Sequence, residues 1–323
     1  MATNMWAEPQ PQPVLAPLSA TAIFLAMTIR PGGEATVRGV LFDLGDLIKA
    51  VSSRNSDAQL TCVAGVGSDA WERLFSGARP VSLHPIRPVA GVNHNAPATL
   101  GDGLFHIRAQ RFDFCFELST LLVRQLSGAV DVVDEVHGFR YFDARDLLGF
   151  MDGTANPIGS DAAKSAHVGD RDPPFRNGSY AVVQIILHDL DRWNTLTVEQ
   201  QEHMMGRTKL DNIEVDTTAG NHVTLNTITD EHGLEHDIVR DNMPFGRVGT
   251  AEFGTYFIGY AADPAVTERM LERMFVGDLP GTYDHILDVS TAVTGALFSV
   301  PSADLLNDLP PSPKQTESPQ DTQ

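Results

Sequence analysis

The strongest constraint on this chain is an order of elements that occurs twice. Short apolar runs predict strands, and apolar residues at helical spacing predict helices. By these two patterns, the first half contains a strand (21–29), a helix (35–51), two strands (60–66 and 104–110), a helix (113–128) and a last strand (131–140). That order is the ferredoxin-like β-α-β-β-α-β unit, in which helices cover one face of an antiparallel sheet.

The second half has a similar pattern. Strands are predicted over 179–187, 222–228, 236–242 and 254–260, and helices near 197–205 and over 264–274, where Pro264 is a typical helix-start residue. The sequence therefore predicts an α+β protein built from two ferredoxin-like halves in tandem.

The ends of the chain differ in composition from these halves. Residues 1–17 and 306–323 are rich in Pro, Ser, Gln and acidic residues, a composition that buries too little apolar surface to become ordered. We expect disordered tails there, an N-terminal half over 18–145 and a C-terminal half over 146–305, which begins near a glycine- and proline-rich stretch.

Composition excludes some classes of function. Hydrophobic residues make up 42% and charged residues 20% of the 323 residues, as in globular proteins, and the net charge of −19 disfavours nucleic acid and acidic membranes as partners. Cys62 and Cys115 are surrounded by apolar residues and indicate a reducing compartment. No signal peptide or membrane-spanning run is apparent, so a cytoplasmic location is expected.

A carboxylate between glycines is the first candidate for chemistry. In the segment GFMDG, Asp152 stands where the backbone can approach a bound group closely, and apolar neighbours such as Phe150 and Met151 could raise its pKa toward that of a useful general base. A plain Asp-Gly turn is the alternative interpretation.

A second candidate is the segment from residue 236 to 242. If it is extended, His236, Ile238, Arg240 and Asn242 share one face, so that a guanidinium and an amide point the same way and can stabilise negative charge on a ligand. Pairing of Arg240 with a structural carboxylate such as Asp237 or Asp241 on a solvated face is the alternative.

Two interpretations compete for histidines in this region. His222, at the start of HVTLNTIT, is by itself one of eleven histidines and without a distinctive pattern. The segment HGLEH matches a zinc-hydrolase pattern that would use His232 and His236. That pattern requires a helix, whereas the glycine inside it and the β-branched flanks favour a turn between strands.

Several segments together resemble the dye-decolourising peroxidases, in particular their bacterial B subfamily. The resemblance extends over most of residues 18–305 and is carried by GFMDG (149–153), GSYAVVQIILHDLDRW (178–193), GRTK (206–209), EHDIVRDNMPFG (235–246), GTYFIGYAADPAVTERMLERMF (254–275) and YDHILDVSTAVTG (283–295). It implies a fold of the dimeric α+β barrel type, with one haem b per chain in the C-terminal half.

The resemblance also implies residue roles. His222 matches the proximal ligand of the haem iron, and Asp284 matches the carboxylate behind it, with Asp288 as the alternative. Asp152, Arg240 and Asn242 match the peroxide-side residues, of which Arg240 also contacts the cofactor. Arg207 is a candidate for pairing with a haem propionate, because a guanidinium suits a carboxylate, and a structural ion pair is the alternative.

The function implied is a peroxidase that reduces hydrogen peroxide and oxidises dyes, phenolic compounds or Mn(II) by one-electron steps. Glu235 is a candidate for attracting Mn(II). A homo-oligomer is expected, and packaging in an encapsulin shell is conceivable, although the C-terminal tail lacks the apolar anchor that such cargo carries. A haem-handling protein with little turnover and a zinc hydrolase are the alternatives.

Overall fold

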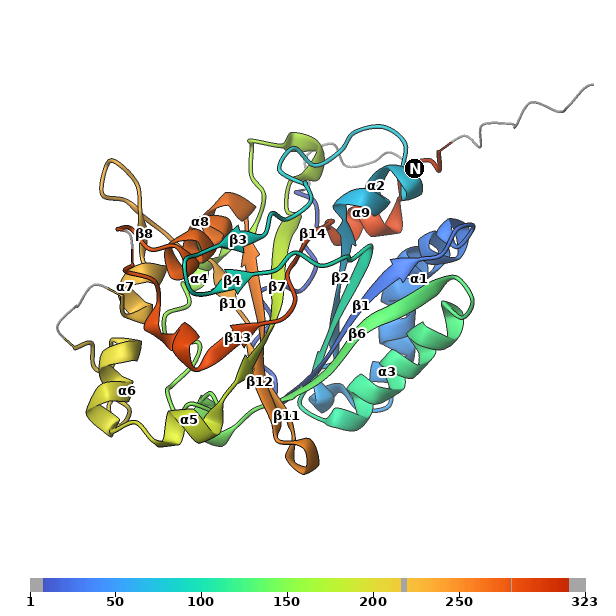
Figure 1. Ribbon diagram of the computed structural model, residues 1–323. Helices are drawn as coiled ribbons and strands as arrows, with labels where there is room; N and C mark the ends of the chain where they lie inside the picture. The colour runs from blue at the N-terminus through green and yellow to red at the C-terminus, as the bar shows by residue number, and fades with distance from the viewer. Residues whose placement is uncertain (1–7, 216–219, 280, 314–323) are drawn as a thin grey trace, which may run out of the picture.

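The computed structural model describes residues 8–215, 220–279 and 281–313, and its elements form two units (Figure 1). The first unit contains β1 (Thr21–Ile29), α1 (Glu34–Ser52), β2 (Thr61–Gly67), α2 (Ser68–Leu74), β5 (Gly103–Ala109), α3 (Phe112–Gln125) and β6 (Val130–Phe139). The second contains β7 (Ser179–His188), α5 (Leu190–Asn194), α6 (Val198–Met205), α7 (His222–Asn226), β10 (Val239–Arg240), β11 (Met243–Arg247), β12 (Glu252–Ala261), α8 (Pro264–Phe275) and β14 (Ala296–Val300).

Shorter elements connect and flank these units. They are β3 (Val89–Ala90), β4 (Asn95–Ala96), α4 (Gly159–Ala166), β8 (Ile228–Thr229), β9 (Glu235–His236), β13 (Ser290–Ala292) and α9 (Ala303–Asn307). None of the helices in the described ranges combines the length and the apolar character needed to cross a bilayer.

The main sheet confirms the prediction of two ferredoxin-like halves. Its strands run in the order β10-β12-β7-β14-β2-β5-β1-β6, and every pair is antiparallel. Within each unit the spatial order is second, third, first and fourth strand, and the units join where β14 pairs with β2. No hydrogen-bonded pairing of described residues joins β10 to β6, so the sheet is not a closed barrel.

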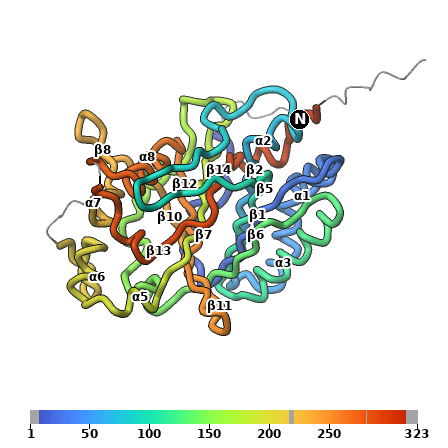
Figure 2. Tube along the Cα trace, in the orientation of Figure 1, coloured from blue at the N-terminus to red at the C-terminus, as the bar shows by residue number. Residues whose placement is uncertain are grey.

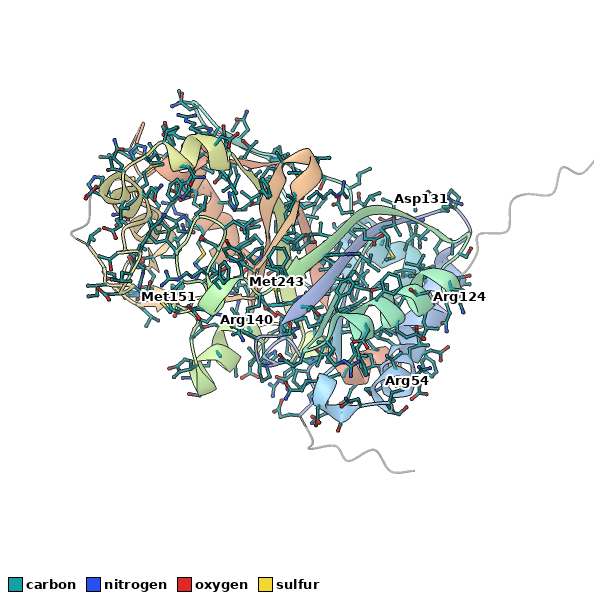
Figure 3. All side chains as sticks on the ribbon, turned by 90° about the horizontal axis from the view of Figure 1, so that it is seen from below. Arg54, Arg124, Asp131, Arg140, Met151 and Met243 are labelled. Carbon is teal, nitrogen blue, oxygen red and sulfur yellow. The ribbon has the colours of Figure 1, made fainter. Side chains whose placement is uncertain are left out.

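The two half-sheets pack face to face and carry their helices outside. Side chains of β1, β2 and β5 meet side chains of β12 and β14 in one apolar cluster that includes Phe24, Leu104, Tyr256, Ile258 and Phe298. The helices α1 and α3 cover the outer side of the first half-sheet, and α8 lies on the outer side of the second (Figure 1). Met243 and Arg140 lie where the two halves meet (Figure 3).

Parts of the predicted tails are ordered. Residues 1–7 and 314–323 lie outside the described residues, but 8–17 and 306–313 pack against the body of the protein. Gln12 and Val14 are 4% and 2% exposed. The N-terminal segment runs beside α9, where the Gln10 backbone N–H donates to Asp304 (Figure 2). The expectation of disorder was wrong here because backbone and amide hydrogen bonds hold a segment with few apolar residues.

Two predicted strands of the second half also differ from the structure. Residues 222–226 form the short helix α7, because the Asn221 side chain accepts a hydrogen bond from the Thr224 backbone N–H at 2.8 Å and caps the helix. The segment 236–242 is divided between β9 and β10. β-branched residues favoured strands in both places, and a local cap and tertiary pairing outweighed that preference.

Candidate functional site

A cavity of about 290 Å³ lies between the outer face of the second half-sheet and the helices α7 and α8. Strands β7 and β12 contribute Ile186 and Phe257 to its wall, and α8 contributes Met270, Leu271 and Met274. Six of the residues singled out in the sequence also line it: Asp152, Arg207, His222, Glu235, Arg240 and Asn242. An apolar cavity with a few convergent polar groups is typical of a cofactor or small-molecule site.

His222 is the first residue of α7 and is held from behind by Asp284. The His222 Nδ1 lies 2.6 Å from Asp284 Oδ2, and Asp284 is 0% exposed. The other oxygen of Asp284 accepts a hydrogen bond from the Ile286 backbone N–H at 3.0 Å. With Nδ1 engaged by the carboxylate, Nε2 is the ring nitrogen left to face the cavity, which suits a metal ligand whose second nitrogen is oriented by a carboxylate.

The carboxylate also affects the pKa of the imidazole. Burial by itself would lower the pKa of His222, but the negative charge and hydrogen bond of Asp284 outweigh it, and the pKa is raised above its ordinary value. Asp288 does not reach His222: its Oδ1 lies 3.1 Å from His94 Nε2 and accepts from the Tyr283 hydroxyl at 3.0 Å. The structure therefore brings Asp284 and not Asp288 to His222.

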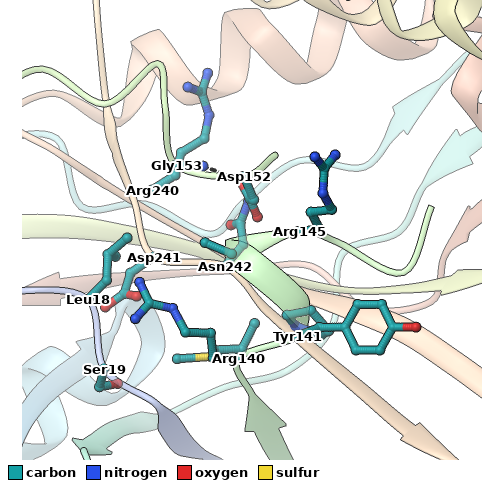
Figure 4. Close-up of a pocket in the computed structure, with 13 residues that line it drawn as sticks. Leu18, Ser19, Arg140, Tyr141, Arg145, Asp152, Gly153, Arg240, Asp241 and Asn242 are labelled. Atoms are coloured by element: carbon teal, nitrogen blue, oxygen red, sulfur yellow. Dashed lines mark hydrogen bonds between the residues drawn. The ribbon is translucent and has the colours of Figure 1, made fainter. Parts of the chain in front are cut away.

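Asp152, Arg240 and Asn242 form a second polar group in the cavity. Figure 4 shows them close together, in a view of the small adjoining pocket that they also line. The Asp152 Oδ1 accepts from the Gly153 backbone N–H at 2.7 Å, and the Asn242 Oδ1 accepts from the Ile258 backbone N–H at 3.2 Å. The expected shared face is thus confirmed for Arg240 and Asn242, which both reach the cavity.

The alternation fails toward the start of that segment. Ile238 is buried away from the cavity, whereas Asp237 lines it, because residues 237 and 238 belong to no strand and β9 pairs with β8 while β10 pairs with β12. Asp241 points to the inner core and pairs with Arg108. The alternative in which Asp241 neutralises Arg240 is therefore wrong.

Burial dominates the electrostatics of this second group. It raises the pKa of Asp152, while the Gly153 N–H, the Asn242 amide and the charge of Arg240 favour the carboxylate and limit the rise. Burial also lowers the pKa of Arg240, against the opposing effect of Asp152. The Arg240 Nη2 lies 3.6 Å from Met270 Sδ, so its guanidinium is directed into the cavity and not toward a tight ion pair.

Arg207 and the HGLEH segment lie at the margins of the site. Arg207 lines the cavity and its Nη2 lies 2.6 Å from Glu214 Oε1. HGLEH forms the end of a turn and β9, where the His236 Nε2 lies 3.2 Å from Asp230 and His232 is exposed. The helix that a zinc hydrolase would need is not formed, and the described ranges contain no group of three metal-ligating side chains.

Sequence reasoning missed two residues of the site. The Asn156 Oδ1 accepts from the Arg240 backbone N–H at 2.9 Å, and its Nδ2 donates to the Arg240 carbonyl at 2.7 Å. It thereby ties the Asp152 loop to the strand that carries Arg240. Asp146 lines the cavity, and burial raises its pKa to about 7. The sequence could have indicated Asn156 and Asp146 only by their positions close to the GFMDG segment.

Two family models match this chain. One, described as "Dyp-type peroxidase, N-terminal", matches residues 11–140, and the other, "Dyp-type peroxidase, C-terminal", matches residues 143–305.

Individual relatives agree with these family matches. A "Dye-decolorizing peroxidase" of Mycolicibacterium paratuberculosis is 55% identical over 307 residues, covering 94% of this chain and 87% of its own. The encapsulated DyP-type peroxidase from Mycobacterium smegmatis has a TM-score of 0.93 and 56% identity, covering 94% of this chain and 100% of its own. Two DypB variant structures, one from Rhodococcus jostii in complex with haem and one in complex with manganese, each have a TM-score of 0.90 and 55% identity, covering 93% of this chain and 99% of theirs.

Proposed function

Because this chain belongs to the family of dye-decolourising, or DyP-type, peroxidases, we propose that His222 binds a haem iron from one side of the cavity and that Asp152, Arg240 and Asn242 act on peroxide at the other. The protein is a haem-dependent peroxidase. The observation that carries the assignment of roles is the 2.6 Å contact between His222 Nδ1 and Asp284, which leaves Nε2 for the metal.

The lining of the cavity fits a haem. Apolar side chains such as Phe257, Leu271 and Met274 suit its flat macrocycle. The Arg207 guanidinium, which now contacts Glu214, is suited to bind one of the haem propionates, either in place of Glu214 or together with it. When bound, the haem supplies electrons that break the O–O bond of peroxide and takes electrons back singly from reducing substrates.

The residues of this chain orient groups and move a proton. Asp284 holds the proton of His222 Nδ1 and makes the ring a stronger electron donor through Nε2. Asp152, when ionised, accepts the proton of the peroxide oxygen that binds and returns it to the oxygen that leaves. Arg240 and the Asn242 amide donate hydrogen bonds to the negative charge that develops as the bond breaks.

The proposed reductants are dyes, phenolic compounds and Mn(II). Glu235 and Asp237 line the cavity, where their negative charge attracts Mn(II), and one of the similar proteins was solved in complex with manganese. A homo-oligomer remains part of this proposal. Enclosure in a protein shell is supported by the encapsulated relative, while the last ten residues of the tail lie outside the described residues.

The test is the absorption spectrum of the haem-reconstituted protein before and after peroxide is added. We expect the intense near-ultraviolet band of a histidine-ligated ferric haem and a rapid change on mixing. His222→Ala should weaken haem binding and change the spectrum, whereas His236→Ala, which removes a histidine outside the cavity lining, serves as the matched control. An unchanged spectrum in His222→Ala would show that another residue is the ligand.

Peroxide reactivity is the second part of that test. Arg240→Ala should retain haem with His222 ligation but react with peroxide at least about tenfold more slowly, because a charged donor to the developing negative charge is lost. If Arg240→Ala reacts at the unaltered rate, the role assigned to the peroxide face is wrong while haem ligation by His222 stands.

A further inference from the structure

A buried ion pair joins the two halves of the molecule directly behind the peroxide-side residues. Arg108 belongs to β5 of the first half and is 1% exposed, and Asp241 belongs to the second half and is 2% exposed. The Arg108 Nη1 contacts Asp241 Oδ2, and its Nη2 donates to the Pro13 carbonyl of the N-terminal segment. Neither side chain lines the haem cavity.

Asp241 stands between the two residues that the peroxide face requires. Side chains alternate along an extended segment, so the face that Asp241 takes determines the face that Arg240 and Asn242 take. The backbone holds this segment on both sides: β10 and β11 pair with β12 in one register, and the Asp241 N–H donates to the Ile258 carbonyl at 3.1 Å. Asn156 also binds the N–H and the carbonyl of Arg240. Asp241 and Asn242 lie between the two paired strands, so a local twist there would change the directions of their side chains and shift the neighbouring Arg240.

Arg108 is the charged partner that keeps Asp241 in the inner core. The other group near the carboxylate is His106, whose Nε2 lies 4.0 Å from Asp241 Oδ2. Burial and the charge of Arg108 hold the pKa of His106 well below its ordinary value, so this ring is neutral. Its Nδ1 is 2.8 Å from the Tyr260 hydroxyl. Within the described part of the chain, Asp241 Oδ1 has no hydrogen-bond partner, which makes the contact with Arg108 decisive.

We propose that Arg108 is a positioning residue for the peroxide face: by holding Asp241 in the inner core, it holds Arg240 and Asn242 in the cavity. This inference rests on the proposed role of Arg240. Without Arg108, the carboxylate of Asp241 is a buried, unpaired charge. A local twist that turns Asp241 toward water relieves that charge and displaces Asn242 and Arg240 from their positions in the cavity.

The experiment uses the haem-loaded ferric protein with fluoride as the probe. Fluoride binds the iron and accepts hydrogen bonds from nearby donors, and its affinity is measured by absorbance without turnover. We expect Arg240→Leu to weaken fluoride binding, and Arg108→Met to weaken it by about tenfold as well, the scale of one lost charge-assisted hydrogen bond. The double variant Arg108→Met/Asp241→Leu removes the unpaired charge, and its fluoride affinity should return to within about twofold of the unaltered protein.

Thermal unfolding of the same proteins separates positioning from stability. If Arg108→Met has a lower melting temperature but an unchanged fluoride affinity, Arg108 only stabilises the fold. If the double variant binds fluoride as weakly as Arg108→Met does, the charge of Asp241 is not the cause of the weaker binding. Either result overturns the proposal. If Arg108→Met does not fold, Arg108→Gln is the second variant, because it keeps a hydrogen-bond donor without the cation. An unaltered fluoride affinity in Arg108→Gln would also show that the charge of Arg108 does not position Asp241. Unaltered affinity in Arg240→Leu would instead contradict the proposed function.

Discussion

In its proposed role Asp152 must be ionised to accept a proton from peroxide, yet it lies where burial favours its neutral form. Burial raises its pKa, and the Gly153 N–H, the Asn242 amide and Arg240 oppose that rise. The carboxylate is therefore more basic than an exposed aspartate, which improves it as a proton acceptor at the expense of its ionised fraction in acid. The proposed chemistry depends on this balance at one residue.

The pH dependence of the peroxide reaction follows from the raised pKa of Asp152. Because the pKa of Asp152 is raised, its ionised fraction falls as the pH decreases through a value above the ordinary ~4 of an aspartate. The rate constant for reaction with peroxide, measured by stopped-flow absorbance, should decrease over that acid range. Asn242→Ala removes a group that favours the carboxylate and should move the decrease to higher pH, and Asp152→Asn should remove it.

Asp134 provides the control for this profile. Burial raises its pKa too, but it lies on β6 and does not line the cavity. Asp134→Asn should leave the acid limb in place, and an acid limb that persists in Asp152→Asn would assign it to another group.

At the scale of elements, α7 shows how a five-residue helix can hold the proposed haem ligand, His222. The Asn221 side chain caps its first turn, and Gly206 lies against that cap with a φ of 88°. A Cβ at Gly206 would lie 2.8 Å from Asn221 Oδ1, so glycine is required there both for its conformation and for space. Two neighbouring segments thus position His222 before any cofactor binds.

Loss of the cap should loosen His222. Asn221→Ala is expected to lower the free energy of unfolding by about 1 kcal/mol and to weaken haem binding, because the first turn of α7 loses its capping acceptor. Asn55→Ala removes a similar cap, which accepts from the Asp57 N–H at 2.8 Å on a helical turn far from the cavity. Urea denaturation and haem titration of both variants test this, and equal haem affinities in the two would contradict it.

At the scale of the whole molecule, the N-terminal segment forms hydrogen bonds with both halves and so helps to hold them together. The Gln12 Nε2 donates to the Ala64 carbonyl at 2.8 Å and to the Pro301 carbonyl at 2.9 Å, and its Oε1 accepts from the Ala64 N–H at 2.8 Å. Ala64 belongs to β2 of the first half, and Pro301 follows β14 of the second. One buried side chain therefore supports the seam where the half-sheets join.

Gln12→Ala should destabilise the protein by roughly 2–4 kcal/mol, since three buried backbone groups lose their partner. The control is Gln110→Ala, whose amide makes only long contacts of 3.4 and 3.3 Å near the surface and should change stability by less than about 0.5 kcal/mol. Denaturant unfolding measures both. A small effect of Gln12→Ala would show that the strand pairing alone holds the seam.

The sequence by itself determined the order of strands and helices in the first half and four elements of the second half (179–187, 197–205, 254–260 and 264–274), and it named several of the residues that gather around the cavity. It did not predict β14. Periodic runs such as 21–29 and 264–274 carry that information locally, because a strand or an amphipathic helix shows its buried face in its own residues. The candidates Asp152, His222 and Arg240 came from motifs that resemble a family. These predictions needed no knowledge of which distant residues touch.

Only the tertiary structure decided between alternatives that depend on distant contacts. It brought Asp284, 62 residues from His222 along the chain, to its ring in place of Asp288, and it paired Asp241 with Arg108, 133 residues away. It also ordered the segment around Gln12 by contacts with both halves. The physical reason is common to all three. A buried charge or amide needs a hydrogen-bonding partner, and that partner is determined by how the sheet is assembled, which the local periodicity of the sequence does not show.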